Sequence, residues 1–476
     1  MLQHQHRFRA AVRRHLWWLK ETKPELERWK FEIQRRTNRW RPAKGGPNVV
    51  LVSVDSMSAK HLHCYGYHRS TSSNLDRLAE RGVLFERVVA QTNWTKPALA
   101  SLLTSVHCSV HKADFVTDTG DRTDEEARLQ ANILDGRFRT IAQEFKDAGY
   151  ATAGLSDGGY AHSFFGFNRG FDLYDDHGGG LKSCGYRLLQ WILKNPEVPF
   201  FGFIHCWDIH FPYLDRPPYN RMFVKSRTPI VLDSSTRLQV NRHQRAISEQ
   251  EVEFLEGLFD GAISYVDQQL GVLLKQFERL GLAGNTIFAI TADHGEAFME
   301  HGALEHTECL YNEVLQVPLI LLGPGLNAGS RIRAQARSVD IMPTLLDLCG
   351  LAPKGRVQGT SLSPWIRGER TDDLIAGSET KRAGGQKAIT DGRYKLIYKE
   401  AGDQVEIYDL LEDPKETKDL SLTNPQLRAR MQTKLRSWEA NVLACANEYW
   451  LDDQIQENID VAPEVTERLR ALGYVD

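Results

Sequence analysis

The fold is decided by the stretch NVVLVSVD, residues 48–55, in which a run of apolar and mostly β-branched residues ends at an aspartate. Such a run is typical of a strand that is buried on both faces, because a strand with one wet face alternates apolar and polar residues. Similar runs recur downstream, and helical segments separate them. The pattern predicts an α/β fold with a mostly parallel sheet sandwiched between helices.

Working outward from residues 48–55, strands and helices alternate along the chain. We expect strands at 83–89, 149–154, 198–205, 286–291 and 317–322, and helices at 75–81, 97–103, 141–148 and 249–280. Ser248 and Glu251 have the spacing of a capping box at the start of the last helix. Three short runs, 387–390, 394–398 and 405–409, predict a small antiparallel sheet near the C-terminus. The expected organisation is a basic helical extension (1–45), a large α/β domain (46–375) and a C-terminal subdomain with terminal helices (376–476).

The composition is that of an ordinary globular protein. The chain has 476 residues, of which 41% are hydrophobic and 25% charged, so it is too rich in apolar residues for an intrinsically disordered chain. Its seven cysteines are few for this length and odd in number, which excludes a disulfide framework. A reducing compartment is the simpler expectation.

The net charge of −3 conceals an asymmetry. Residues 1–45 contain 13 Lys and Arg against 4 Asp and Glu, a charge of +9, which leaves −12 for the remainder. Residues 1–42 are expected to form an amphipathic helix that packs on the body of the protein or on a partner protein. A basic and aromatic surface for an anionic membrane is the alternative. Nucleic-acid binding is not expected, because no recognition motif accompanies the charge.

The sequence indicates no membrane-spanning segment, since no run approaches the ~18 apolar residues that a spanning helix needs. Only Leu16, Trp17, Trp18 and Leu19 follow the basic start as an apolar cluster, which is too short for the core of a signal peptide. A cytoplasmic location is therefore expected, with peripheral membrane association as the alternative. Nothing in the sequence indicates the oligomeric state.

Carboxylates and imidazoles stand where predicted strands end. Asp55 follows the first strand, and Asp293 and His294 follow the strand at 286–291. In parallel sheets, sites form at the carboxyl ends of the strands, and oxygen and nitrogen ligands there suit a divalent metal. Taken one at a time, a strand-end aspartate is more often a helix N-cap, and an Asp-His pair is more often a surface turn.

Thr95 precedes Pro97, which is expected in the first turn of a helix. A hydroxyl at the positive end of a helix lies where an anion is stabilised, although a simple N-cap is the alternative. A metal beside this hydroxyl would lower its pKa and make it a nucleophile. Two further loops carry five histidines, which are candidates for substrate contact or acid catalysis: His205 and His210 in 205–213, and His294, His301 and His306 in 293–306.

A series of short motifs follows in order along the chain: Asp55, Ser73-Asn74-Leu75-Asp76-Arg77-Leu78-Ala79, Thr95-Lys96-Pro97-Ala98, His210-Phe211-Pro212-Tyr213, Thr291-Ala292-Asp293-His294-Gly295-Glu296, Ser338-Val339-Asp340-Ile341-Met342-Pro343-Thr344, Asp391-Gly392-Arg393-Tyr394 and Tyr408-Asp409-Leu410. In these motifs the chain resembles the sulfatase family of the alkaline phosphatase superfamily, collinearly over roughly residues 47–425. The resemblance implies an alkaline-phosphatase-like fold and an enzyme that cleaves small anionic esters.

The departures from the family pattern bear on the chemistry. Sulfatases mature a Cys or Ser to formylglycine within a C/S-x-P-x-R motif, whereas Thr95 holds that position here and Leu99 replaces the arginine. Oxidising the secondary hydroxyl of threonine would give a ketone, not an aldehyde. Ser56 stands where the family has a second aspartate, and His294 stands where many calcium sulfatases have asparagine. A threonine nucleophile instead resembles the phosphoryl-transfer members of the superfamily.

The resemblance implies a site with one divalent metal, held by Asp55, Thr95, Asp293 and His294. Its imidazole favours Zn or Mn, with Ca as the alternative.

The same comparison implies roles around the metal. Thr95 would be the catalytic nucleophile on a phosphate ester, in a hydrolase or a transferase, and His210 would contact the ester or protonate the leaving group. Asn74, Lys96 and His306 would bind the substrate anion, although a solvent-facing Lys96 is equally compatible with the sequence. Two competing hypotheses stay open: sulfate-ester hydrolysis by unmodified Thr95, and a non-catalytic protein that binds a metal or an anion.

Overall fold

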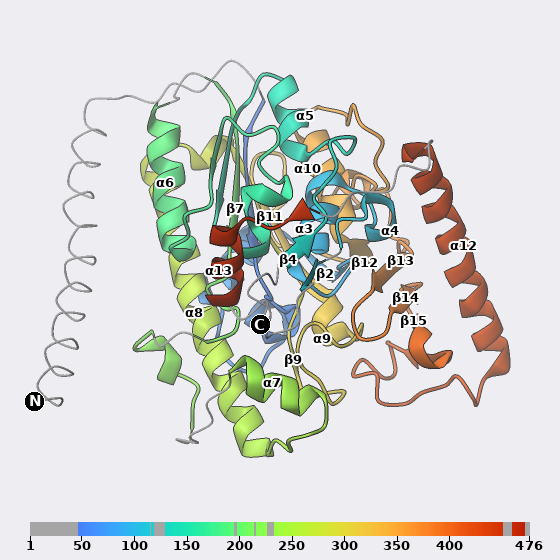
Figure 1. Ribbon diagram of the computed structural model, residues 1–476. Coiled ribbons are helices and arrows are strands. Elements are labelled where there is room, and N and C mark those ends of the chain that lie inside the picture. Colours follow the sequence, from blue (N-terminus) through green and yellow to red (C-terminus); the bar gives the residue numbers. More distant parts are fainter. Residues whose placement is uncertain are drawn as a thin grey trace, which may run out of the picture.

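The computed structural model describes residues 46–114, 116–118, 129–194, 198–213, 216–225, 233–450 and 459–471, arranged around one eight-stranded sheet (Figure 1). The strand order is β12-β2-β11-β8-β1-β7-β5-β6. The strands are β1 (Asn48–Val54), β2 (Val83–Val89), β5 (Ala151–Ser156), β6 (Leu173–Asp175), β7 (Phe200–Cys206), β8 (Thr286–Ala292), β11 (Gln316–Leu322) and β12 (Ser330–Arg337).

The sheet is mostly parallel, and the central strand β1 is buried along its whole length, as the run at 48–54 predicts. Only β11 runs antiparallel to its neighbours, β8 and β2. The α/β prediction with a mostly parallel sheet is confirmed.

Helices cover both faces of the sheet (Figure 1). On one face α6 packs on β5 and β7 and against α8, which in turn contacts α2, while α3, α5 and α10 pack together on the other face. The main helices are α2 (Ser73–Arg81), α3 (Thr95–Thr104), α5 (Ile141–Asp147), α6 (Gly180–Lys194), α8 (Glu249–Arg279) and α10 (Ile341–Leu348). The predicted capping box of α8 is present, because Ser248 Oγ accepts from Glu251 N and the Glu251 carboxylate accepts from Ser248 N.

The small antiparallel sheet near the C-terminus has four strands, where the sequence predicts three. They are β13 (Ala376–Thr380), β14 (Gln386–Thr390), β15 (Tyr394–Lys399) and β16 (Gln404–Asp409), in that order. The additional strand β13 is rich in small and polar residues, so its propensity gives no strand signal. The helix α12 (Pro425–Tyr449) packs against β14 and β15.

The remaining elements are short. They are α4 (Cys108–His111), β3 (Val116–Asp118), β4 (Leu129–Ala131), α7 (Ser234–Asn241), β9 (Ala297–Phe298), β10 (Leu304–Glu305), α9 (Asn312–Leu315), α11 (Ser363–Ile366), β17 (Ile459–Asp460) and α13 (Pro463–Ala471). The last described segment lies beside elements from the first half of the chain, because β17 pairs with β4 and Arg468 donates a hydrogen bond to the Asp157 carbonyl.

The predicted basic extension, residues 1–45, lies outside the described residues. Among the helices that the structure describes, none is both long and apolar enough to cross a membrane.

The contact between β13 and α12 yields a stability prediction. A Cβ at Gly377 would lie 2.1 Å from Cε2 of the Trp438 indole, so Gly377→Ala must displace the ring. Overpacking of this kind costs about 1–3 kcal/mol, and we expect a clear decrease in the melting temperature measured by calorimetry. Gly284→Ala is the matched control, because an added Cβ there meets no atom within 4 Å. Equal melting temperatures for the two variants would contradict this packing.

A second prediction concerns His111, which closes α4 beneath the helix α3. Its Nδ1 accepts from Ala113 N at 3.0 Å, so Nε2 carries the proton and donates to Ser101 Oγ at 3.1 Å. Burial, with the nearby Lys96 and Lys381 charges, lowers the pKa of His111 to about 3. The unfolded chain takes up a proton below pH 6.5 that the folded protein cannot accept, so this residue makes stability fall between pH 6.5 and 3. Denaturant unfolding of His111→Gln should show a shallower loss over that window, and an unchanged slope would contradict the assignment.

Candidate active site

Three neighbouring strands end side by side and bring polar residues to one edge of the sheet. β1 lies between β7 and β8, and the register pairs Val54 with Ala292 on one side and with Cys206 on the other. Asp55 and Asp293 therefore each stand one residue beyond a paired position, and His205 is the penultimate residue of β7. Sequence positions more than 200 residues apart converge here because parallel strands end at the same edge.

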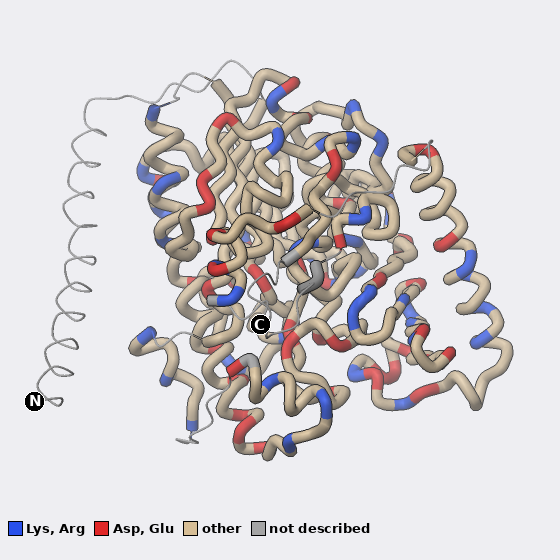
Figure 2. Tube along the Cα trace, viewed as in Figure 1, with Lys and Arg blue, Asp and Glu red and all other residues tan. Residues whose placement is uncertain are grey.

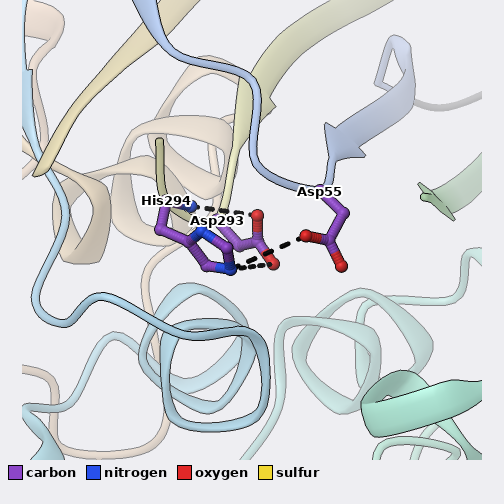
Figure 3. A group of neighbouring side chains, drawn as sticks. All are labelled: Asp55, Asp293 and His294. Atoms are coloured by element: carbon purple, nitrogen blue, oxygen red, sulfur yellow. Dashed lines mark hydrogen bonds and ion pairs between the residues drawn. The ribbon is translucent and has the colours of Figure 1, made fainter. Parts of the chain in front are cut away.

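Asp55, Asp293 and His294 point toward one another at this edge (Figure 3). Their nearest ligand atoms all lie within 4.8 Å of one another, and His294 Nε2 is 3.6 Å from both Asp55 Oδ1 and Asp293 Oδ2. All three side chains are buried. The group is a candidate site for a divalent metal, the kind of cofactor that the sequence predicts.

The hydrogen bonds of Asp293 and His294 are more consistent with a cation-binding site than with a surface turn. Asp293 Oδ1 accepts from the backbone N–H groups of Ser56 and His294, but the buried Oδ2 has no hydrogen-bond partner among the described residues. His294 Nδ1 donates to the Gly295 carbonyl at 3.0 Å, which leaves Nε2 facing the carboxylates. Burial alone would raise the pKa of Asp293, but the His294 and His205 imidazoles hold it below its ordinary value.

Thr95 lies at the start of α3, two residues earlier than the Pro-initiated helix that the sequence predicts. Its hydroxyl is not a helix cap, because Oγ1 donates to Asp55 Oδ2 at 3.3 Å and lies 3.3 Å from His294 Nε2. The side chain is 1% exposed. The hydroxyl thus adjoins the metal candidate and stands at the positive end of a helix.

His306 and His210 continue the site away from the carboxylates. The His306 ring centroid is 4.3 Å from that of His294 and 5.3 Å from that of His210. His306 Nδ1 is 3.3 Å from a carboxylate oxygen of Glu296. Burial, together with the neighbouring His294 and His210 imidazoles, holds the pKa of His306 well below its ordinary value. The structure therefore brings both predicted histidines to the site.

Lys96 is buried and does not face solvent. Its Nζ donates to Asn132 Oδ1 at 3.0 Å and lies 5.2 Å from the Phe165 ring centroid. Burial lowers the pKa of Lys96 well below its ordinary value, with Arg382 adding to the effect. The solvent-facing alternative is wrong, and these contacts give Lys96 a packing role beneath Thr95.

Asn74 lies in the contact between α2 and α8. Its backbone N–H and its side-chain NH₂ group donate to Asp267, and its side-chain Oδ1 accepts from Arg77. These bonds tie the start of one helix to the middle of another, and they involve no member of the metal candidate. The geometry therefore supports a structural role for Asn74, in place of the predicted contact with the anion.

Three further residues lie near the site, and of these the sequence names only His205, as one of five candidate histidines without an assigned role. His205 approaches both carboxylates, Glu296 adjoins His306, and Arg382 reaches in from the small C-terminal sheet. The Arg382 guanidinium, in the turn between β13 and β14, lies 4.2 Å from the ring of Trp94, the residue before Thr95. A strand-end position was a signal for His205, whereas no local pattern marks Arg382.

The positive charge around the site is local. Figure 2 shows Lys and Arg mixed with Asp and Glu along the described trace, without a broad face of one sign in this view. Arg237, in α7, is paired with Glu305 at 2.7 Å and, with Arg382, is among the charges that lower the pKa of His306. An anionic substrate would thus meet individual guanidinium groups beside the site.

Comparison with known proteins identifies the family. The Sulfatase family model matches residues 47–351, more than half of the chain, and a model of the C-terminal part of N-sulphoglucosamine sulphohydrolase matches residues 299–441. The chain belongs to the sulfatase family, whose members are ester-hydrolysing enzymes, and the resemblance seen in the sequence is confirmed.

Individual relatives are distant. A Δ4,5-hexuronate-2-O-sulfatase of Bacteroides thetaiotaomicron is 23% identical over 425 residues, which cover 80% of this chain and 85% of that protein. Among solved structures, a 2-O GAG sulfatase superposes with a TM-score of 0.67 at 20% identity, covering 88% of this chain and 96% of the other. A phosphonate monoester hydrolase of Agrobacterium radiobacter gives 0.66 at 20% identity, covering 88% and 100%. These structures show the same fold.

The carboxylate and imidazole group yields a metal-binding prediction. Asp293→Asn removes a negative charge from the candidate ligands, so we expect metal affinity to fall by about 100-fold or more. Elemental analysis of the purified protein, followed by chelator competition, measures the effect. Asp267→Asn is the control, because that carboxylate binds Asn74 in the α2–α8 contact. Equal metal content and affinity in the two variants would contradict the site.

Proposed function

We propose that the chain is a metal-dependent hydrolase that cleaves a phosphate ester with Thr95 as its nucleophile. The observation that carries the proposal is the position of Thr95 Oγ1, 3.3 Å from both Asp55 Oδ2 and His294 Nε2. A nucleophile needs a means of losing its proton and a pocket for the charge that develops during attack. The candidate metal site would help the Thr95 hydroxyl to lose its proton, and the metal together with the amino end of α3 would stabilise the developing charge.

Asp55, Asp293, His294 and the Thr95 hydroxyl would hold the metal. One imidazole among oxygen ligands favours Zn or Mn over Ca, which prefers shells made only of oxygen. When bound, the ion would lower the pKa of the Thr95 hydroxyl and stabilise charge on the ester oxygens.

The proposed reaction proceeds in two displacements. Thr95 releases its proton to water and its Oγ attacks phosphorus, so that the Oγ–P bond forms while the bond from phosphorus to the leaving alcohol breaks. His210 gives the departing oxygen a proton, and the alcohol leaves. A water molecule then attacks the phosphothreonine, releases inorganic phosphate and restores the hydroxyl.

The position of His210 supports its role as the acid. It follows β7 in the loop that faces His306, and its Nδ1 donates to the Phe211 carbonyl, which orients the ring. Proton exchange with a substrate would then use Nε2. A protonated imidazole near pH 7 is an ordinary general acid.

His306, Arg382 and Arg237 would bind the oxygens of the anionic group that do not face the metal. Arg382 and Arg237 are among the charges that lower the pKa of His306, and Arg382 stacks on Trp94 directly before the nucleophile. A planar guanidinium pairs with two oxygens of a phosphate at once. Because the family arginine is replaced by Leu99, we infer that Arg382 supplies part of the missing charge from another element.

Phosphate is favoured over sulfate because threonine cannot be matured to the formylglycine aldehyde. The second candidate is hydrolysis of a sulfate ester by unmodified Thr95, which the sulfatase relatives favour. One solved relative was determined with D-glucosamine-2-N,6-O-disulfate as its substrate. We therefore expect a small anionic ester in either case, with a sugar as one possible alcohol.

The test compares Thr95→Ala with Thr104→Ala on aryl phosphate, phosphodiester, phosphonate and sulfate esters. Thr104 is in the last turn of the same helix, and its hydroxyl donates to the Ala100 carbonyl, so it controls for loss of a buried threonine. We expect Thr95→Ala to lower kcat/KM by at least about 1,000-fold while metal stays bound, and Thr104→Ala to retain activity. Thr95→Ser, which keeps a hydroxyl, should retain part of the wild-type activity.

Three outcomes would change the proposal. Turnover that survives in Thr95→Ala would overturn the nucleophile. Cleavage of sulfate esters alone would select the second candidate. No turnover of any ester by a wild-type protein that binds metal would favour a non-catalytic role. Acid-quenched protein mass, with one phosphoryl group added at Thr95, would identify the covalent intermediate directly.

A further inference from the structure

His205 lies within ion-pair distance of both carboxylates of the site, but its two ring nitrogens have no hydrogen-bond partner among the described residues. Its Nε2 is 3.5 Å from Asp293 Oδ2 and 3.9 Å from Asp55 Oδ2, and its side chain is 2% exposed. Neither ring nitrogen forms a hydrogen bond within the part of the chain that the structure describes. Buried polar atoms are nearly always paired, and leaving one unpaired costs about 1–3 kcal/mol, so the position calls for an explanation.

The orphaned atoms face one another. Asp293 Oδ2 is also buried without a hydrogen-bond partner, and it is the carboxylate atom nearest to His205 Nε2. A separation of 3.5 Å is too long for a good hydrogen bond. It is instead the separation of two atoms that bind one ion, since ligands about 2.1 Å from a tetrahedral metal lie about 3.4 Å apart.

Similar distances separate the donor atoms of the other residues proposed to hold the metal. His294 Nε2 is 3.6 Å from Asp55 Oδ1 and from Asp293 Oδ2, and Thr95 Oγ1 is 3.3 Å from Asp55 Oδ2. The ligand atoms of Asp55, Asp293 and His294 all lie within 4.8 Å of one another, and His205 Nε2 lies 3.5 Å and 3.9 Å from the two carboxylates.

We propose that His205 is a further ligand of the metal, so that two imidazoles join the Asp55 and Asp293 carboxylates and the Thr95 hydroxyl around one zinc-like transition-metal ion. The inference deepens the proposed function by assigning the ligand set and the class of ion. Two nitrogen donors among oxygen donors suit zinc or cobalt and do not suit calcium. The backbone supports the assignment, because β7 pairs directly with β1 and so holds His205 beside the end of the strand that carries Asp55.

The alternative is that His205 is an imidazolium that merely neutralises the two carboxylates. Burial would lower the pKa of His205, but Asp293 and Asp55 raise it above its ordinary value. In that case the ring would be a positioning group, and removing it would leave the geometry of the bound metal unchanged. The two roles therefore differ in what a spectroscopic probe of the metal would report.

The experiment uses full-length protein stripped of metal and refilled with Co²⁺ or Zn²⁺, without substrate. In His205→Asn we expect Zn²⁺ affinity, measured by chelator competition, to fall by at least about 100-fold, since losing a residue that only supports a ligand already costs 10–100-fold. The visible absorption spectrum of bound Co²⁺, which depends on its coordination, should change. His177→Asn, a change at an exposed histidine, controls for weak surface binding.

A second variant keeps the test decisive if His205→Asn folds poorly. His205→Cys places a thiolate at the same position, so we expect it to bind Co²⁺ with a new sulfur-to-cobalt charge-transfer band. Unchanged Zn²⁺ affinity and Co²⁺ spectra in His205→Asn, or no such band in folded His205→Cys, would overturn the assignment. Because no measurement involves turnover, an inactive protein would refute the proposed function and leave this inference standing.

Discussion

The structure depends on the burial of two carboxylates, Asp55 and Asp293, at the ends of adjacent strands. Two unscreened negative charges in a low-dielectric interior repel each other and lose their hydration, so they need positive charge close by. Backbone N–H groups satisfy part of Asp293, the Thr95 and Ser56 hydroxyls satisfy part of Asp55, and imidazoles adjoin both. The negative charge that these contacts leave uncompensated explains why this edge of the sheet suits a divalent cation.

The rest of the fold serves to hold that edge in register. β1 is fully buried between β7 and β8, which keeps the three strand ends level, and α3 points its first turn at them. The small C-terminal sheet also contributes a residue beside the site, because the turn between β13 and β14 places Arg382 over Trp94. A site built from five separate segments needs each of them to be rigid, since ligand and nucleophile positions matter within fractions of an ångström.

Part of the site could be predicted from local sequence. Asp55 and the Asp293-His294 pair stand directly after strongly apolar runs, and the strand ends of a parallel sheet meet, so their convergence follows from the pattern. Asn74 could not be assigned in this way, because its partner Asp267 lies on α8 and no local pattern reveals a contact between helices. Lys96 was equally ambiguous, since a lysine in an apolar helix can be buried or exposed depending on what packs over it.

The sequence by itself determined the α/β class, the family and the residue types available for chemistry, because periodicity and motif order are local properties of the chain. It is also the source of the proposal that Thr95 is the nucleophile. Only the tertiary structure decided which of several histidines adjoin the carboxylates, and that Arg382 from a distant hairpin lies over Trp94, next to Thr95. Those choices depend on strand order and on contacts between segments hundreds of residues apart, which local residue patterns do not specify.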